Sequence, residues 1–126
     1  MVPGRVLLVD DDATTLLIMS AALRKAGYDV QTHDSGFGLA VAIRSYQPSI
    51  VLLDVDMPGL SGDRALEAAN TVDHGLRGKV CFVLHSALPE RQLARLVNNV
   101  GADGYLVKPI PPQELADRLE PFTKAR

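Results

Sequence analysis

Five short apolar runs alternate with longer stretches of helical periodicity, and this alternation restricts the folds open to the chain. Three of the runs, RVLLV, SIVLL and KVCFVL, are apolar almost throughout. Continuous apolar runs of this length are typical of strands that are buried on both faces of a parallel sheet. The predicted strands are Arg5–Val9, Tyr28–Thr32, Ser49–Leu53, Lys79–Leu84 and Asp103–Val107.

The intervals between these runs carry apolar side chains at helical spacing. In the first interval Leu16 and Leu23 fall on one face, and Gly27 stands where a helix would end. The second helix is predicted behind an N-cap at Ser35, and a polar loop is predicted over 71–78. The remaining helices are predicted from about Asp63 to Asn70, from Pro89, and from Pro111 and Pro112. Five β-α units predict an α/β fold, a doubly wound five-stranded parallel sheet with five helices on its two faces.

The composition fits one domain with a substantial core. The chain has 126 residues, of which 47% are hydrophobic, and a formal net charge of −2. Because the sequence has no basic stripe, we expect no direct nucleic-acid contact by this domain. No apolar run approaches the ~20 residues that span a bilayer, so we expect no membrane segment. A single cysteine, Cys81, and the lack of a signal-peptide pattern favour a cytoplasmic location.

Polar and charged side chains stand where four of the predicted strands end. The acids Asp10–Asp12 follow the first strand, Asp54 follows the third, Ser86 ends the fourth and Lys108 follows the fifth. In parallel sheets of this class, functional residues gather at the carboxyl ends of the strands. The sequence therefore predicts one site at this edge of the sheet.

The acids of this set suit a divalent cation. Mg²⁺ prefers oxygen ligands and usually takes one or two carboxylates together with waters and phosphate oxygens. Asp10 or Asp11 together with Asp54 would supply the carboxylates, and a backbone carbonyl near Asp56 would add one more oxygen. A bound cation would also offset the repulsion between neighbouring carboxylates.

The same set suits the transfer of a phosphoryl group. A carboxylate can accept a phosphoryl group and become an aspartyl phosphate. Lys108 would pair with one oxygen of the transferred group, and Ser86 would donate a hydrogen bond to another. The residues thus predict phosphoryl transfer onto an aspartate.

Four stretches resemble the receiver domains of two-component response regulators. They are VLLVDDD, IVLLDVDMPGLSG, FVLHSALP and GADGYLVKPI, and they follow the order that this family shows. The resemblance covers nearly the whole chain, so residues 1–126 are expected to form one receiver domain. It implies a flavodoxin-like sheet with the strand order 2-1-3-4-5.

The resemblance implies a role for each acid of the predicted site. Asp54 matches the residue that accepts the phosphoryl group. Asp10 and Asp11 match the acidic pair, with Asp11 as the direct Mg²⁺ ligand, and Asp56 stands where the family contributes a main-chain carbonyl to the metal.

The resemblance also implies a switch. Ser86 matches the hydroxyl that follows the phosphoryl group, and Tyr105 matches an aromatic residue that turns inward on activation. Lys108 matches the lysine of the site, and its bond to Pro109 is expected to be cis. Leu88 stands where many relatives carry a polar residue, and we expect it to limit the approach of water and to lengthen the lifetime of the phosphoryl group.

The implied partners are a sensor histidine kinase, which supplies the phosphoryl group, and an output domain or downstream protein that the sequence does not identify. The resemblance allows a homodimer. However, ADGYL at 102–106 lacks the second acid of the ADDYL found in relatives that dimerise through the face between the fourth and fifth predicted helices. The charged end, PFTKAR, favours a receiver that is cut from a longer protein.

Several of these residues also have ordinary structural explanations. The acids Asp10–Asp12 can cap a helix, Ser86 can be the N-cap of the helix that begins near Pro89, and Tyr105 can be a plain packing aromatic. His85 adjoins Ser86 but should point to the opposite face of its strand, so we do not expect it to act as a base. His33, His74 and His85 have no spacing that suits a metal site.

Two other functions compete with the receiver hypothesis. The first is a pseudo-receiver that binds partners without phosphorylation, although its acid set would then be unused. The second is a phosphatase, because VLLDVDM also resembles the D-x-D motif of haloacid-dehalogenase-type enzymes. Those enzymes place the motif on their first strand, whereas here it lies mid-chain.

Overall fold

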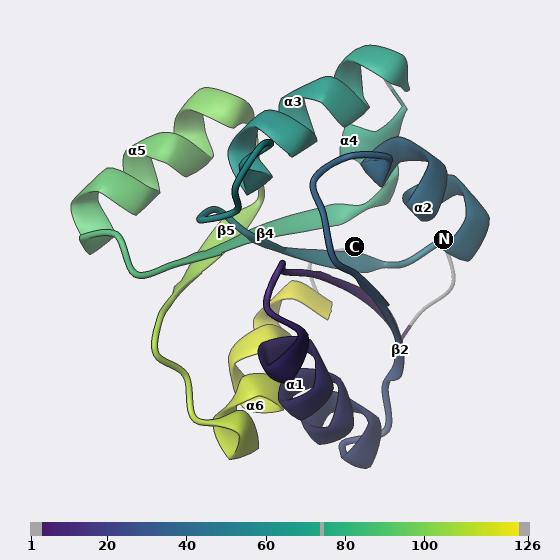
Figure 1. The fold of residues 1–126 in the computed structure, drawn as a ribbon, viewed down its shortest axis with the longest axis vertical. Coiled ribbons are helices and arrows are strands. Elements are labelled where there is room, and N and C mark those ends of the chain that lie inside the picture. Colours follow the sequence, from purple (N-terminus) through teal and green to yellow (C-terminus); the bar gives the residue numbers. More distant parts are fainter. Residues whose placement is uncertain (1–3, 74, 124–126) are drawn as a thin grey trace.

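The computed structural model describes residues 4–73 and 75–123 of the chain. Strands and helices alternate along most of this length, as Figure 1 shows. The elements are β1 (Arg5–Val9), α1 (Ala13–Lys25), β2 (Asp29–His33), α2 (Leu39–Tyr46), β3 (Ile50–Asp54), α3 (Gly62–Val72), α4 (Leu76–Lys79), β4 (Cys81–Ser86), α5 (Glu90–Val100), β5 (Gly104–Val107) and α6 (Pro112–Thr123).

The five strands form one sheet in the order β2-β1-β3-β4-β5, and every neighbouring pair is parallel. This is the predicted architecture and strand order. The three inner strands are apolar because helices cover both of their faces, and all of the residues of β3 and β4 are buried. The parallel arrangement brings all carboxyl ends of the strands to one edge.

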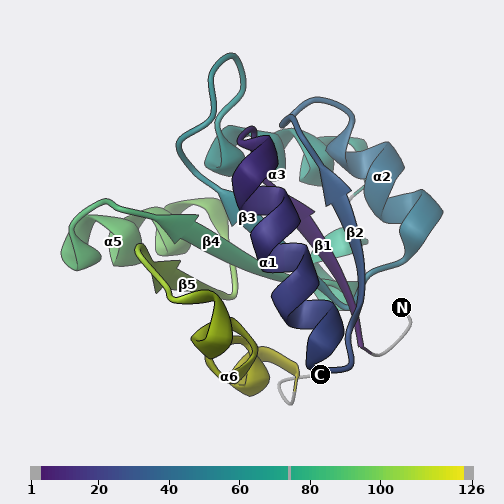
Figure 2. The same ribbon diagram turned by 60° about the horizontal axis from the view of Figure 1, so that its bottom comes forward.

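Two helical layers enclose the sheet. Helices α1 and α6 cover one face, and α2, α3 and α5 cover the other (Figure 1). Figure 2 shows α1 lying across the front of the sheet with α6 beside it. The alternation of side chains along each strand divides the core accordingly, since Val6 and Leu8 face α1 and α6 whereas Leu7 and Val9 face the other layer.

Four of the five predicted strands shift by one or two residues in the structure, and only β1 has the predicted bounds. The shifts on β3 and β4 matter for function, because they make Asp54 and Ser86 the last residues of these strands. The predicted strands stop at the last apolar residue before each of these polar residues. In the structure, backbone hydrogen bonds extend both strands to include them. Both side chains are consequently fixed by the sheet itself.

Two local predictions are corrected. Ser35 is not the N-cap of α2, because this helix begins at Leu39 after Gly38, whose φ is 74°; the Ser35 hydroxyl instead accepts the Phe37 N–H at 3.0 Å. The predicted loop 71–78 is partly helical, since α3 continues to Val72 and the one-turn helix α4 follows. Burial of Leu76 explains the second correction, because its side chain joins the core on the α2, α3 and α5 side. His74 lies outside the described residues.

The structure also bears on the prediction about membranes. Among the helices of the described segments, none is long and apolar enough to cross a bilayer.

Replacing Phe82 tests the importance of the sheet core. Phe82 is fully buried on β4, so Phe82→Ala should lower the free energy of unfolding by about 3–5 kcal/mol through lost burial and a cavity. Phe37→Ala is the matched control, since 62% of Phe37 is exposed and its loss should cost less than about 1 kcal/mol. Urea unfolding measures both values, and equal effects would contradict the assigned core.

Candidate phosphoryl-transfer site

The predicted site residues meet at the carboxyl edge of the sheet. Asp10 continues β1, where its N–H donates to the His33 carbonyl at 3.1 Å, and Asp54 ends the neighbouring strand β3. Ser86 ends β4, and its carbonyl accepts the Lys108 N–H at 2.8 Å. The strand order thus places an acid, an acid, a hydroxyl and an ammonium on four neighbouring strands.

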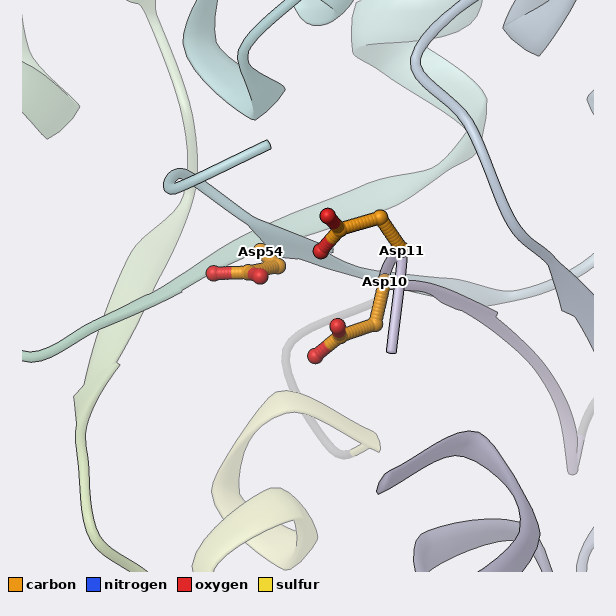
Figure 3. A group of neighbouring side chains, drawn as sticks. All are labelled: Asp10, Asp11 and Asp54. Carbon is orange, nitrogen blue, oxygen red and sulfur yellow. The ribbon is translucent and has the colours of Figure 1, made fainter. Parts of the chain in front are cut away.

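Three carboxyl groups form the centre of the site. Asp10, Asp11 and Asp54 each offer one oxygen, and these oxygens all lie within 4.8 Å of one another. Figure 3 shows the side chains of Asp10 and Asp11 leaving the end of β1 on opposite sides, with Asp54 beside them. Asp10 and Asp54 are buried, whereas Asp11 is exposed. The group is therefore anchored in the protein and open to solvent on one side.

Lys108 brings a positive charge to these acids. Its Nζ donates to Asp54 Oδ1 at 2.9 Å and lies 3.9 Å from Asp10 Oδ2. Two backbone N–H groups also donate hydrogen bonds to these carboxylates. The Asp56 N–H donates to Asp54 Oδ1 at 3.1 Å, and the Asp12 N–H donates to Asp10 Oδ1 at 2.9 Å. Among the described residues, the ion pairs at the centre join this one ammonium to Asp10 and Asp54, so the three carboxylates outnumber the positive charge.

This excess charge acts against ionisation of Asp10. Burial is the largest cause that raises the pKa of its carboxyl group, and the nearby Asp54 raises it further, against the lowering effects of the Asp12 N–H and Lys108. Two unit charges about 4.8 Å apart repel by about 3 kcal/mol at an effective dielectric of about 20. A cation between the acids would relieve this repulsion.

The donor set fits a hard divalent cation such as Mg²⁺. Carboxylate oxygens are the ligands that Mg²⁺ prefers, and the exposed position of Asp11 leaves room for the waters that this ion retains. Asp11 also lines an open groove of about 550 Å³ between α1 and β2. The Asp56 carboxylate is not in the group of three, and it accepts the Ser86 hydroxyl at 3.3 Å.

Ser86 is fully buried at the end of β4. Its Oγ donates to Asp56 Oδ2 and accepts the Leu88 N–H at 3.0 Å. The N-cap position of α5 is Pro89, so the alternative in which Ser86 caps this helix is wrong. The Ser86 hydroxyl is instead hydrogen-bonded to Asp56, which lies in the loop that follows β3.

Gly62 is a residue of this site to which the sequence analysis gave no role. A Cβ at this position would lie 2.2 Å from the carbonyl oxygen of Asp54, closer than any real side chain allows. The glycine therefore lets the start of α3 pack directly against the backbone of Asp54. The signal was present in the sequence as the glycine that closes the stretch DVDMPGLSG.

Tyr105 stands apart from the acids. It lies on β5, and its hydroxyl donates to Glu90 Oε1 on α5 at 2.9 Å. This hydrogen bond is the main reason that the pKa of the tyrosine is raised.

The peptide bond between Lys108 and Pro109 is cis, as expected.

His85 lies on the face of β4 opposite to Phe82 and Leu84. It borders Leu8 and Leu52, which belong to the core beneath α1 and α6, so the expectation that it points away from Ser86 is confirmed. Burial, with a smaller effect of Lys108, lowers the pKa of its imidazole to about 4. His85 is therefore neutral at physiological pH.

Comparisons with known proteins agree with this geometry. A family model described as "Response regulator receiver domain" matches residues 6–120. Transcriptional regulatory protein PrrA of Mycobacterium tuberculosis is 32% identical over 122 residues, which are 97% of this chain and 51% of that protein. DNA-binding response regulator MtrA of the same species is 33% identical over 91% of this chain and 48% of its own length. The chain thus spans about half the length of these curated relatives.

Solved structures show the same fold. Chemotaxis protein CheY4 of Vibrio cholerae superposes with a TM-score of 0.85 at 25% identity, covering 96% of this chain and 99% of that chain. The BeF3-activated N-terminal receiver domain of RstA from Klebsiella pneumoniae gives a TM-score of 0.79 at 28% identity, covering 95% and 98%. Both agree with the flavodoxin-like strand order.

The lowered pKa of His85 predicts a specific acid sensitivity. Between pH 6.5 and about 4 the unfolded chain protonates this imidazole and the folded chain does not, so stability falls as the pH falls through this range. The difference corresponds to about 3 kcal/mol at most. His85→Met should lose less stability than the wild type between pH 7 and pH 4, and chemical unfolding at several pH values measures this.

His33→Met is the matched control, because His33 is partly exposed and its Nε2 lies 2.6 Å from the Phe37 carbonyl oxygen. Parallel stability profiles for the wild type and His85→Met would contradict the assigned burial of the imidazole.

Proposed function

Because the chain belongs to the family of response regulator receiver domains, we propose that it accepts a phosphoryl group onto Asp54 from the phosphohistidine of a sensor histidine kinase. The observation that carries this proposal is the set of three carboxylate oxygens within 4.8 Å, with Lys108 donating to the acceptor. We propose that residues 1–126 act as one receiver domain, and the family match over 6–120 supports this extent.

The contacts of Asp54 suggest which of its oxygens reacts. Oδ1 accepts both Lys108 Nζ and the Asp56 N–H, which orients the carboxylate and leaves Oδ2 as the nucleophile. In the transfer, a bond forms between Oδ2 and phosphorus while the bond from phosphorus to the histidine nitrogen of the kinase breaks. The electron pair of the broken bond stays on that nitrogen.

Mg²⁺ held by Asp10, Asp11, Asp54 and a main-chain carbonyl at Asp56 would neutralise negative charge on the transferred group. The chain itself contributes the ammonium of Lys108, which can turn from Asp54 to an oxygen of the phosphoryl group. Removing the metal should therefore prevent phosphorylation although the acceptor stays in place.

The signal to a partner would depend on which group accepts the Ser86 hydroxyl, the Asp56 carboxylate or a phosphoryl group on Asp54. In the structure this hydroxyl donates to Asp56, and a phosphoryl group on Asp54 would offer it a more highly charged acceptor. We propose that Ser86 then leaves Asp56 and that Tyr105 gives up Glu90 and turns inward. This change would alter the face formed by α5, β5 and α6, where a partner protein or output domain binds.

The relatives suggest what such a face would control. MtrA is named a DNA-binding response regulator, and its match to this chain covers about half of its length. We propose that this domain acts on an output domain or downstream protein, with a homodimer as one arrangement, and makes no nucleic-acid contact of its own. Its place in the cell would be the cytoplasm, where the kinase presents its phosphohistidine.

Intact mass spectrometry tests the proposal. The protein is incubated with acetyl phosphate in the presence of Mg²⁺ or of a chelator, beside Asp54→Asn. The wild type should gain one phosphoryl group only with Mg²⁺, and the variant should gain none, because Asp54 is the nucleophile.

Each other result has a definite meaning. No adduct in a wild type that binds Mg²⁺ would contradict the proposal and favour a pseudo-receiver. An adduct that persists in Asp54→Asn would mean that another residue accepts the group. Steady hydrolysis of a phosphate ester would favour the phosphatase alternative.

Leu88 provides a second test, of the lifetime of the phosphoryl group. This side chain is half-buried against the core on the α2, α3 and α5 side, and its N–H donates to Ser86. Leu88→Glu should speed dephosphorylation about tenfold, equal to about 1.4 kcal/mol off the barrier, because a polar side chain admits and orients water. Leu88→Met, which keeps an apolar side chain, should not change the rate; an unchanged rate in Leu88→Glu would remove the idea.

A further inference from the structure

A small cavity lies beneath the acid group, between α1 and the sheet. Its volume is about 10 Å³, and apolar side chains from α1, β1 and β3 form most of its wall. Two polar residues also line it, Asp10 from the end of β1 and His85 from β4. Only 5% of the His85 surface is exposed, and its Nε2 has no hydrogen-bond partner within the described part of the chain.

A histidine in this layer needs an explanation. The residues on the same face of β4, Cys81 and Val83, are buried in an apolar core, and another apolar side chain at position 85 would continue that layer. Buried polar atoms in native proteins are almost always hydrogen-bonded. The neutral imidazole has one donor and one acceptor nitrogen, so Nε2 requires a partner in either tautomer.

Asp10 faces the same space from the other side. Figure 3 shows its carboxyl group turned to the side of the sheet on which α1 and α6 lie. Oδ1 accepts the Asp12 N–H, and Oδ2 lies 3.9 Å from Lys108 Nζ. A carboxylate accepts about four hydrogen bonds, so Asp10 retains capacity for another donor.

We propose that His85 Nε2 and the Asp10 carboxylate bind one internal water, and that this water makes His85 a positioning residue for Asp10. A cavity holds one water when the volume open to a water-sized sphere is about 10–15 Å³ and at least two polar groups line it. The cavity beside His85 has about 10 Å³ of such volume and two polar residues in its wall. Water can donate to Asp10 while it either accepts from or donates to Nε2, so it suits both tautomers of the imidazole.

The role of the water follows from where Asp10 stands. Some residues do not bind a metal themselves but form hydrogen bonds to a ligand of the metal and orient it. Replacing such a residue typically weakens metal binding by about 10–100-fold. A water fixed by His85 would hold the buried carboxylate of Asp10 at its distance from Asp11 and Asp54. This second step rests on the proposed function, whereas the water site itself does not.

The test combines two measurements on the same proteins. Crystal structures of the wild type and of His85→Met, at a resolution that shows ordered waters, reveal whether the cavity is filled. Calorimetric titration with MgCl₂ gives the affinity of each protein for the metal. We expect one water within hydrogen-bond distance of both Nε2 and Asp10 in the wild type, no such water in the variant, and about tenfold weaker Mg²⁺ binding.

Two further variants separate positioning from packing. His85→Gln keeps a polar group that can hold the water, so it should bind Mg²⁺ more tightly than His85→Met. His33→Met makes the same substitution at a histidine whose Nε2 already lies 2.6 Å from the Phe37 carbonyl oxygen, and it should leave the affinity unchanged.

A wild-type cavity without a water, or a direct bond from Nε2 to a protein atom, overturns the water site. A water that is present while His85→Met binds Mg²⁺ with unchanged affinity overturns the positioning role. A wild type that holds the water but binds no Mg²⁺ overturns both the positioning role and the metal step of the proposed function, and leaves the water site established.

Discussion

The interaction on which this structure depends is the attraction between one ammonium and a group of carboxylates that repel one another. Lys108 donates to Asp54 at 2.9 Å and lies 3.9 Å from Asp10, while Asp11 completes the acid group on its exposed side. The strand order makes this arrangement feasible. Asp10 directly follows β1, and Asp54 ends the adjacent strand β3. Lys108 directly follows β5, so its long side chain must reach past the end of β4 to meet them.

The apolar body of the sheet makes such a charged edge tolerable. Strands β3 and β4 are buried along their whole length, and two helical layers enclose them. Native proteins are stable by only about 5–15 kcal/mol, so repulsion of a few kcal/mol at the edge requires a well-packed core beneath it. The direct packing of Gly62 against the backbone of Asp54 adds to this, because it fixes the acceptor without a side chain between the two segments.

Much of this arrangement could be predicted from the sequence, because two strong signals coincide. Continuous apolar runs marked the strands, and a parallel sheet necessarily brings residues such as Asp54 and Lys108 to one edge. The cis bond at Pro109 was expected from the family resemblance alone, and the structure shows it. The roles assigned to these residues in phosphoryl transfer remain proposals.

What the sequence did not predict depends on contacts between segments that are distant in the chain. Ser35 has the chemistry of an N-cap, but the N-cap of α2 is Gly38, three residues later and in the left-handed conformation. The hydrogen bond between Asp56 and Ser86 joins residues that are 30 positions apart, and no local sequence pattern predicts it. The His85 nitrogen that has no hydrogen-bond partner among the described residues could likewise be found only from the packing of α1 on the sheet.

The most direct test of the central claim is thermal unfolding of the wild type and Asp11→Asn, each with a chelator and with MgCl₂. Asp11 is the exposed member of the acid group, so its neutralisation relieves repulsion without disturbing the core. We predict that Asp11→Asn melts at a higher temperature than the wild type without metal, and that Mg²⁺ raises the melting temperature of the wild type far more than that of the variant. A variant that melts lower than the wild type without metal, or a wild type that does not respond to Mg²⁺, would contradict the account.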